Sequence, residues 1–238
     1  MSKISFIKEN FAKNYKHEEG IAPDNRLVHN VFNGCGIHTR SGVKTLIRML
    51  KPKFILEIGS YHFETANQMA YTFDELYGSD HSIGHIHSFD IKKGGYDGVL
   101  FNPGSSRITS HTWIPQKTAF DDWKYTDPEI TSKCDYANIT NEEIFERNLK
   151  YLKSITPASG FDMVYIDGDH SYKGAAYDLE YSLKVINSEA VIIIDDIWDH
   201  RLHQVRDFFN DLKNEKWDFV EWNMANRDKV QNMGVFLP

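Results

Sequence analysis

The chain has 238 residues, of which 41% are hydrophobic and 13% aromatic, which is enough apolar material for one globular domain with a sizeable core. Its net charge is −7 and it has no Lys/Arg block that could neutralise phosphates, so nucleic acid is not expected as a partner. Cys35 and Cys134 lack CxxC or zinc-type spacing and are expected to be free thiols. The charged N-terminus and the absence of long apolar runs predict a cytoplasmic protein with no membrane partner.

Helical and strand-like patterns alternate along most of the chain. In chain order we expect a helix at 41–50, a strand at 54–60, a helix at 64–77, strands at 85–91 and 107–114, a helix at 141–155 capped by Thr140 or Asn141, a strand at 161–167, a helix at 171–186, a strand at 190–196, a helix at 203–214, and strands at 217–222 and 234–237. This alternation predicts βαβ units and a mostly parallel sheet. The last two strands are joined by a polar loop without a helix, so they should pair antiparallel.

Two regions lie outside this regular pattern. Residues 1–38 are expected to form an N-terminal extension that acts as a lid, with 33–36 (NGCG) as a hinge, whereas residues 39–238 form the main domain. The segment 92–140 is rich in aromatic residues, glycine and proline, and we expect it to help form the wall of a substrate site. Tyr61, Trp198 and His200 are candidate lining residues, with ordinary packing or surface exposure as the alternative.

Two of the expected strands end in carboxylates. Asp167 follows MVYI, and Asp195 with Asp196 follows AVIII one helical crossover later. If these strands are neighbours in a parallel sheet, the three carboxylates meet at one edge, where their repulsion favours a bound cation. Oxygen ligands favour magnesium, with calcium and manganese as alternatives. His170, next to this cluster, is suited to proton abstraction, while Asp169 is expected to cap the following helix. The simpler alternative is that Asp195 and Asp196 only face water.

The first two strands carry a different set of polar residues at their ends. FILEIGS places Glu57 near the end of a strand and Gly59 at the turn, and HIHSFD ends in Asp90. A small residue at such a turn lets a ligand approach the backbone, and an acid at the second strand can bind ribose hydroxyls. Because neither GxxxxGK[ST] nor GxGxxG occurs, the site does not look built for a pyrophosphate. These features favour an adenosine-type ligand without phosphates.

The segments LEIGS and SFD resemble the cofactor-binding half of class I S-adenosylmethionine-dependent methyltransferases. FDMVYIDGDHSYKGAAYDL followed by AVIIIDDI is similar to metal-dependent sugar O-methyltransferases of the macrocin O-methyltransferase type, and more distantly to catechol and caffeoyl-CoA O-methyltransferases. The resemblance covers residues 40–238. It implies an α/β, Rossmann-like, doubly wound sheet of seven strands, mostly parallel, with an antiparallel last strand. It also implies a small-molecule acceptor that carries a hydroxyl, on a sugar or another vicinal diol, with a phenolic or catechol-like acceptor left open.

The resemblance assigns roles to individual residues. It implies that the metal ligands are Asp167, Asp195 and Asp196 and that the general base is His170. It also implies cofactor-binding residues, which are Glu57, Gly59, Ser60 and Asp90. Phe63 departs from the family pattern, which usually has a second glycine there. Because phenylalanine tolerates positive φ poorly, we expect the loop or the cofactor to sit differently.

Other functions also fit parts of the sequence. Asp167-Gly168-Asp169 is a DxD motif that could hold a nucleotide-sugar in a glycosyltransferase, although this leaves Asp195 and Asp196 unexplained. Phe63 would also suit a non-catalytic protein on a methyltransferase scaffold. His81, His85 and His87 are a candidate zinc site, for which a polar sheet face is the more common explanation. The sequence is compatible with a homo-oligomer.

Overall fold

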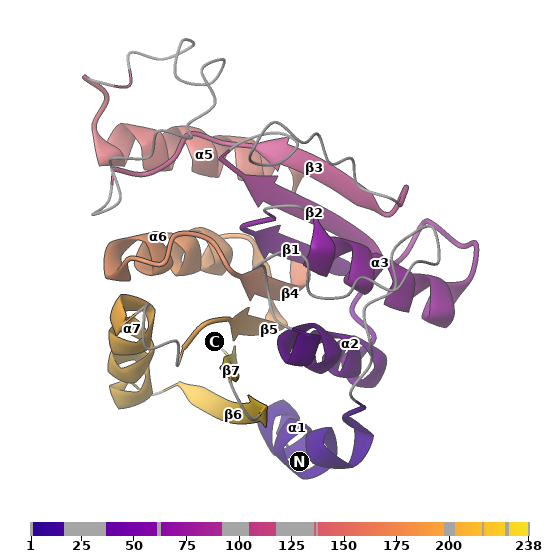
Figure 1. Ribbon diagram of the computed structural model, residues 1–238. Helices are drawn as coiled ribbons and strands as arrows, with labels where there is room; N and C mark the ends of the chain where they lie inside the picture. Colours follow the sequence, from indigo (N-terminus) through magenta and orange to yellow (C-terminus); the bar gives the residue numbers. More distant parts are fainter. Residues whose placement is uncertain are drawn as a thin grey trace.

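The computed structural model describes residues 2–16, 37–60, 63–91, 105–117, 136, 138–197, 203–215, 217–226 and 229–237. Seven strands form one sheet in the order β3-β2-β1-β4-β5-β7-β6 (Figure 1). The strands are β1 (Phe54–Ile58), β2 (His85–Asp90), β3 (Ile108–Thr112), β4 (Phe161–Ile166), β5 (Ile186–Ile194), β6 (Asp218–Asn226) and β7 (Lys229–Leu237). The described helices are α1 (Lys3–Asn14), α2 (Ile37–Leu50), α3 (Glu64–Tyr77), α5 (Asn141–Ile155), α6 (Tyr172–Leu183) and α7 (His203–Asn214).

The strand directions confirm the predicted Rossmann-like sheet. Neighbouring strands from β3 through β5 pair in parallel, and β7 pairs antiparallel with both β5 and β6. The boundaries of α3 and α7 match the predicted ranges, whereas β5 begins at Ile186 rather than 190. β6 and β7 are longer than expected because their pairing continues through polar residues, from Asp218 opposite Leu237 to Asn226 opposite Lys229. Within the described ranges, no helix combines the length and apolar character that crossing a membrane requires.

Alternate residues of the strands face two separate hydrophobic layers. On β1, Ile55 packs into a layer with α1, α2 and α3, whereas Leu56 and Ile58 pack into a layer with α5, α6 and α7 (Figure 1). On β4, Met163 and Tyr165 likewise face the α1–α3 side. Because successive side chains of a strand point to opposite faces, this alternation fixes the face on which each polar residue of a strand lies.

The start of the chain contains a helix that the predicted elements lack. The side chain of Ser2 caps α1 by accepting a hydrogen bond from the backbone N–H of Ser5. Ile4, Ile7 and Phe11 are buried in the same core cluster as residues of α2, β6 and β7. Helix α1 is therefore packed against the main domain; residues 17–36, which include the expected hinge, lie outside the described residues.

Two helix starts test the predicted caps. Thr140 caps α5 with a capping box, in which its side chain accepts from Glu143 N–H and the Glu143 carboxylate accepts from Thr140 N–H. This confirms the first of the two caps considered. At α6 the cap is Ser171, whose hydroxyl accepts from Gly174 N–H, so the prediction that Asp169 is the cap was wrong. Asp169 instead accepts a hydrogen bond from Ser171 N–H at 2.8 Å and so orders the turn before the helix.

The backbone links between strands continue beyond the ends of β1 and β4. Asp167 N–H donates to Ile58 O at 2.8 Å, and Gly59 N–H donates to Phe89 O at 2.8 Å. Gly59 has φ of +89°, and a Cβ placed on it would lie 1.9 Å from the carbonyl oxygen of Asp167. The turn after β1 therefore requires glycine both for its conformation and for its close approach to β4.

A group of histidines lies on the α5 side of β2 and β3. The Nδ1 of His87 is 3.0 Å from the Nε2 of His111, and the Nδ1 of His111 is 2.8 Å from the hydroxyl of Tyr151. His85 instead pairs with Thr109, and His81 pairs with Ser106. Burial lowers the pKa of His87 and His111 to about 4, and the nearby charge of His85 adds to the shift. These contacts form hydrogen bonds across one face of the sheet. The described residues contain no group of three histidines with the geometry of a metal site, and the zinc alternative stays a prediction.

We expect Gly59→Ala to destabilise the domain more than Gly78→Ala, which serves as the matched control. Both glycines have positive φ, but a Cβ on Gly78 would meet no atom within 4 Å. Backbone strain alone should cost about 1–3 kcal/mol at Gly78, and overpacking against β4 should add roughly 1–3 kcal/mol at Gly59. Chemical denaturation of both variants measures the difference. Equal losses of unfolding free energy in the two variants would contradict the close approach of Gly59 to Asp167.

We expect acid to destabilise the domain through His87 and His111. Their pKa of about 4 in the fold lies below the ordinary value of 6.5, so the unfolded chain binds more protons between these values. Their contribution to stability is complete above pH 6.5 and is lost as the pH falls toward 4. At pH 5 the loss should be roughly 1 kcal/mol for each ring, about half of the full linkage value because both rings are partly solvated.

Thermal unfolding of the double variant His87→Gln, His111→Gln measures this effect. The fall in midpoint between pH 7 and pH 5 should be smaller in this variant than in the wild type. His81→Gln, at an exposed position, is the control and should keep the wild-type pH dependence. An unchanged pH dependence in the double variant would show that the two rings are not the cause.

Candidate functional site

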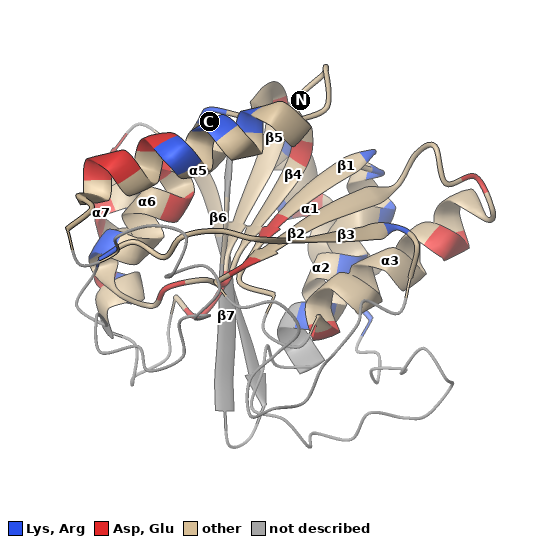
Figure 2. Cartoon of the chain, turned by 90° about the horizontal axis from the view of Figure 1, so that it is seen from above, with Lys and Arg blue, Asp and Glu red and all other residues tan. Residues whose placement is uncertain are grey.

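An acidic cluster with one imidazole lies at the carboxyl end of the parallel strands. The Nε2 of His170 is 3.4 Å from the Oδ1 of Asp167 and 3.6 Å from the Oδ2 of Asp196. One potential ligand atom from each of the three residues lies within 4.8 Å of the others. Figure 2 shows Asp and Glu residues in red where the central strands end. This is the one group within the described ranges whose geometry suits a metal ion.

Strand pairing brings these residues together. β4 and β5 are parallel neighbours with Ile166 opposite Ile194, so the residues that follow the two strands meet at one edge. Asp196 has φ of +57°, a left-handed conformation that aspartate adopts more readily than most residues. The expected convergence of the two chain segments is therefore present, with Asp167 and Asp196 as the residues that approach each other.

Asp195 is placed differently from its neighbour. It is 4% exposed, and its Oδ2 accepts a hydrogen bond from the Tyr165 hydroxyl at 2.6 Å. Its Oδ1 accepts from the backbone N–H of Asp196 at 2.8 Å. Side chains of β5 alternate between the two faces of the sheet, and Asp195 follows Val191 and Ile193 on the α1–α3 side. From there its carboxylate holds the backbone N–H of Asp196. Its role as a third metal ligand stays a prediction.

The carboxylates control the protonation of His170. Burial lowers the pKa of its imidazole, but the hydrogen bond and charge of Asp167, together with the charges of Asp196 and Asp195, outweigh burial and raise it to about 9. The ring therefore carries a proton at neutral pH in this arrangement and offsets part of the negative charge. The two carboxylates of the cluster, Asp167 and Asp196, still outnumber its one cation, so the site attracts further positive charge.

Asp178 lies beneath the turn that carries Asp167 and His170, and the sequence pattern did not reveal it. Asp178 belongs to α6 and is 7% exposed. A Cβ on Gly168 would lie 2.4 Å from its Oδ2, so the carboxyl group packs directly against the turn. Burial and the charge of Asp169 raise its pKa well above the usual value. A glycine preceding Asp169 was the signal for this packing.

The polar residues after β1 and β2 lie at the same edge of the sheet. Glu57 is fully buried, is opposite Ser88 on β2, and accepts a hydrogen bond from the Ser88 hydroxyl. Burial raises the pKa of Glu57, and the charges of Asp167 and Asp90 add to the rise, to about 8 overall. The hydrogen bond from Ser88 lowers the pKa but does not outweigh these effects. The Oε1 of Glu57 and the Oγ of Ser60 are buried without a hydrogen-bond partner among the described residues.

Such unsatisfied atoms are costly unless a ligand meets them. With the close turn at Gly59, they fit a ligand that brings hydrogen-bonding groups to the backbone, which is compatible with the predicted adenosine-type ligand. Asp90 is 7% exposed at the end of β2, where the predicted ribose contact would be. Tyr61, Trp198 and His200 lie outside the described residues.

Phe63 ends the turn after β1 in an unusual conformation. Its φ is +59° and ψ is 20°, so this phenylalanine is left-handed. Its side chain is 2% exposed in the core cluster on the α1–α3 side. Burial of the ring, worth about 1.5–3 kcal/mol, offsets a strain of about 1–2 kcal/mol. The expectation that the loop or the cofactor sits differently stays a prediction.

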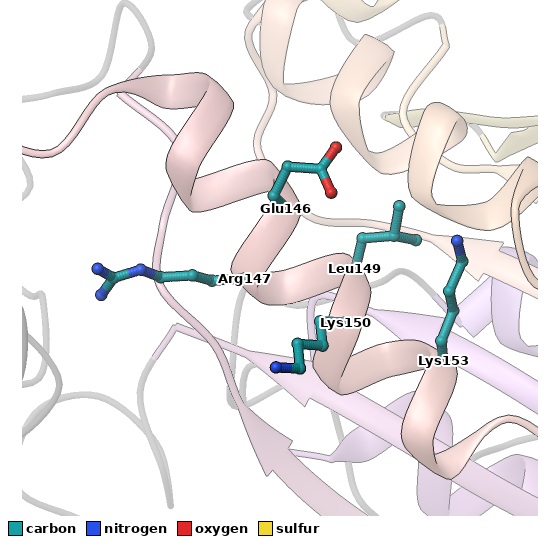
Figure 3. Close-up of a pocket in the computed structure, with 5 residues that line it drawn as sticks. All are labelled: Glu146, Arg147, Leu149, Lys150 and Lys153. Atoms are coloured by element: carbon teal, nitrogen blue, oxygen red, sulfur yellow. The ribbon is translucent and has the colours of Figure 1, made fainter.

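A separate hollow of about 460 Å³ lies along α5 and is lined by Glu146, Arg147, Leu149, Lys150 and Lys153 (Figure 3). Glu146, Leu149 and Lys153 lie on one side of the helix, whereas Arg147 and Lys150 extend from the other side. The described residues that line this hollow all come from α5 and include none of the predicted site residues. It is open and distinct from the acidic cluster.

Comparisons with known proteins identify the family and the fold of this chain. A family model described as a methyltransferase domain matches residues 56–197. The structure is similar to an O-methyltransferase from Bacillus cereus in complex with SAH, with 15% identity, a TM-score of 0.54, and coverage of 98% of this chain and 89% of that chain. It is also similar to the O-methyltransferase TomG from Streptomyces achromogenes in complex with SAM, with 15% identity, a TM-score of 0.53, and coverage of 86% and 81%. No curated protein sequence matches the chain significantly.

The matched segment contains the central strands and every residue of the acidic cluster. It spans more than half of the chain, and the similar structures share the fold at low sequence identity. The chain therefore belongs to the methyltransferase domain family, and its fold is that of O-methyltransferases that bind SAM or SAH.

Proposed function

We propose that the protein transfers a methyl group to a hydroxyl of a small molecule and that a divalent cation assists the reaction. The observation that carries this proposal is the meeting of Asp167, His170 and Asp196 at one edge of the sheet. They lie beside the turn after β1 that contains Gly59 and Ser60, here called the cofactor turn. Similar folds in O-methyltransferases with SAM or SAH bound support methylation at oxygen. The expected cytoplasmic location and the absence of a nucleic-acid partner are part of the proposal.

The cofactor-binding residues are Glu57, Gly59, Ser60 and Asp90. When bound, S-adenosylmethionine supplies an electrophilic methyl group. Glu57 and Ser60 offer buried polar atoms that are unsatisfied among the described residues, and Gly59 leaves the backbone open to close approach. Asp90 and Glu57 can accept hydrogen bonds from hydroxyl groups. The single backbone link from Gly59 to Phe89 keeps the ends of β1 and β2 in register for this contact.

The proposed cation site consists of Asp167 and Asp196, with magnesium as the preferred ion. A cation held there supplies positive charge that lowers the pKa of an acceptor hydroxyl. Asp195 positions Asp196 through its hydrogen bond to the Asp196 N–H, or joins it as a third ligand as the family resemblance implies. The Tyr165 hydroxyl fixes the Asp195 carboxylate in either case.

His170 is the proposed general base. Its imidazole is one-third exposed, so it can reach both the carboxylates and a molecule in solvent. Asp167 accepts from its ring and orients it, in the way that a carboxylate orients a catalytic imidazole. A cation held by Asp167 and Asp196 would offset their charge, and the ring of His170 would then be able to accept a proton from the acceptor hydroxyl.

We propose a vicinal diol, in particular a sugar, as the acceptor class. Two adjacent oxygens suit a hard cation with open positions, because both can approach it in place of water. The carboxylates lie at an edge of the sheet where Asp167 and Asp196 are partly exposed. A catechol offers the same pair of oxygens and is the alternative acceptor.

We expect Asp167→Asn and Asp196→Asn to weaken binding of magnesium or manganese by at least about 10-fold, since each removes a charged ligand. Asp169→Asn is the matched control, because Asp169 is used in the turn before α6 and is not part of the cluster. Calorimetry with manganese measures the affinities, and Asp195→Asn shows whether Asp195 is a ligand. Unchanged affinity in both Asp167→Asn and Asp196→Asn would refute the cation site.

We expect methyl transfer from labelled S-adenosylmethionine to a hydroxyl of a diol-bearing acceptor, and its loss with a chelator. His170→Gln should lower kcat by about 100-fold or more while leaving the affinity for S-adenosylhomocysteine within about twofold. Mass spectrometry of products from sugar and catechol panels measures the transfer. A product methylated on nitrogen, or a rate that does not respond to chelation, would contradict the proposal.

A further inference from the structure

Buried polar atoms without partners are concentrated beside the cofactor turn. In the part of the chain that the structure describes, four side-chain atoms are of this kind: Arg40 Nε, Glu57 Oε1, Ser60 Oγ and Asp178 Oδ2. Two of them belong to the cofactor-binding residues already discussed. Arg40, which no motif singled out, supplies a third, and unlike the others it carries a positive charge.

Arg40 lies in α2 and reaches the start of α3. It is 6% exposed, and its Nη1 donates to the Oε2 of Glu64 at 2.9 Å. Glu64 is the first residue of α3 and follows the turn in which Phe63 N–H donates to Ser60 O. The guanidinium is therefore anchored at the same turn that holds Ser60. Its Nε–H has no acceptor among the described residues.

Arg107 shows what a purely structural arginine looks like in this fold. It is fully buried, and all three of its nitrogens donate: Nε to Asp74, Nη1 to the carbonyls of Asp80, Ile83 and Gly84, and Nη2 to the carbonyl of Gly78. Among the described residues, Arg40 has one carboxylate partner, Glu64, and its Nε–H donates to none. A buried guanidinium with an unused N–H is costly unless an acceptor from outside the chain meets it.

The charge around the turn identifies the chemistry of that acceptor. Glu64 and Asp90 place carboxyl groups there, beside the buried Glu57, whose pKa is raised to about 8, so an anionic ligand group needs a cation to enter. The planar fork of arginine matches a carboxylate, which it binds through two parallel hydrogen bonds. S-adenosylmethionine carries one carboxylate, on its amino-acid portion.

We propose that Arg40 binds the α-carboxylate of S-adenosylmethionine and thereby selects cofactors that retain the amino-acid portion. The proposal rests on the proposed cofactor site and adds to it a residue from a different helix. Glu64 holds the guanidinium in place while leaving Nε available. Arg40 is thus a specificity-determining residue for the cofactor.

The test compares two ligands that differ in the amino-acid portion. S-adenosylhomocysteine has the carboxylate, whereas 5′-methylthioadenosine keeps the adenosine and lacks it. We expect Arg40→Met to weaken binding of S-adenosylhomocysteine by about 10- to 100-fold and to leave binding of 5′-methylthioadenosine within about twofold. Isothermal calorimetry on the full chain measures both affinities, without any need for turnover.

Lys44→Met is the matched control, since Lys44 is a second buried cation on α2 that lies 5.7 Å from the ring centre of Tyr71. It should leave both affinities within about twofold. If Arg40→Met weakens both ligands equally, or neither, the proposal fails. If the Arg40→Met variant does not fold, a second test uses the wild type and compares S-adenosylmethionine with its decarboxylated form. Equal affinity for these two ligands overturns the proposal. A wild type that binds none of these ligands would refute the cofactor site itself.

Discussion

The parallel pairing of β4 with β1 on one side and with β5 on the other is the constraint on which the whole site depends. It brings the turns after these strands to one edge, and the hydrogen bonds from Asp167 to Ile58 and from Asp195 to Ile166 extend the pairing beyond the strands. The cofactor turn and the acidic cluster are therefore held by the same ladder. A change of register by one residue would turn every side chain of a strand to the opposite face of the sheet. It would thereby separate the cofactor turn from the acidic cluster.

Three residues at this edge have unusual backbone conformations. Gly59, Phe63 and Asp196 all have positive φ, and they lie in the turns after β1 and β5. Such conformations persist only where the surroundings compensate for the strain. Burial of the Phe63 ring and the hydrogen bond from Asp196 N–H to Asp195 are the compensating contacts. Phe63 and Asp196 are thus held in these conformations by contacts within the chain, which lowers the entropic cost of ordering them on binding.

The electrostatics of the edge explain why cations matter there. Glu57 and Asp178 are buried and hold their protons to higher pH than usual, while Asp167 and Asp196 are partly exposed beside His170. Burial of so many acids in one place favours any positive group that can approach. His170 and Arg40 are the protein's own cations at the two ends of this region, and the proposed divalent ion and the sulfonium of the cofactor would add to them.

The sequence by itself determined the order of strands and helices and the acidic strand ends, because hydrophobic periodicity and turn chemistry are local properties. The helical spacing of Ile4, Ile7 and Phe11 after Ser2 also marked α1, although the charged character of the segment obscured it. Only the tertiary structure decided which of the adjacent Asp195 and Asp196 joins the cluster, since that depends on a left-handed residue and a contact with Tyr165. It alone placed Arg40 and Asp178 beside the site, because these residues come from helices whose faces are set by packing across the sheet.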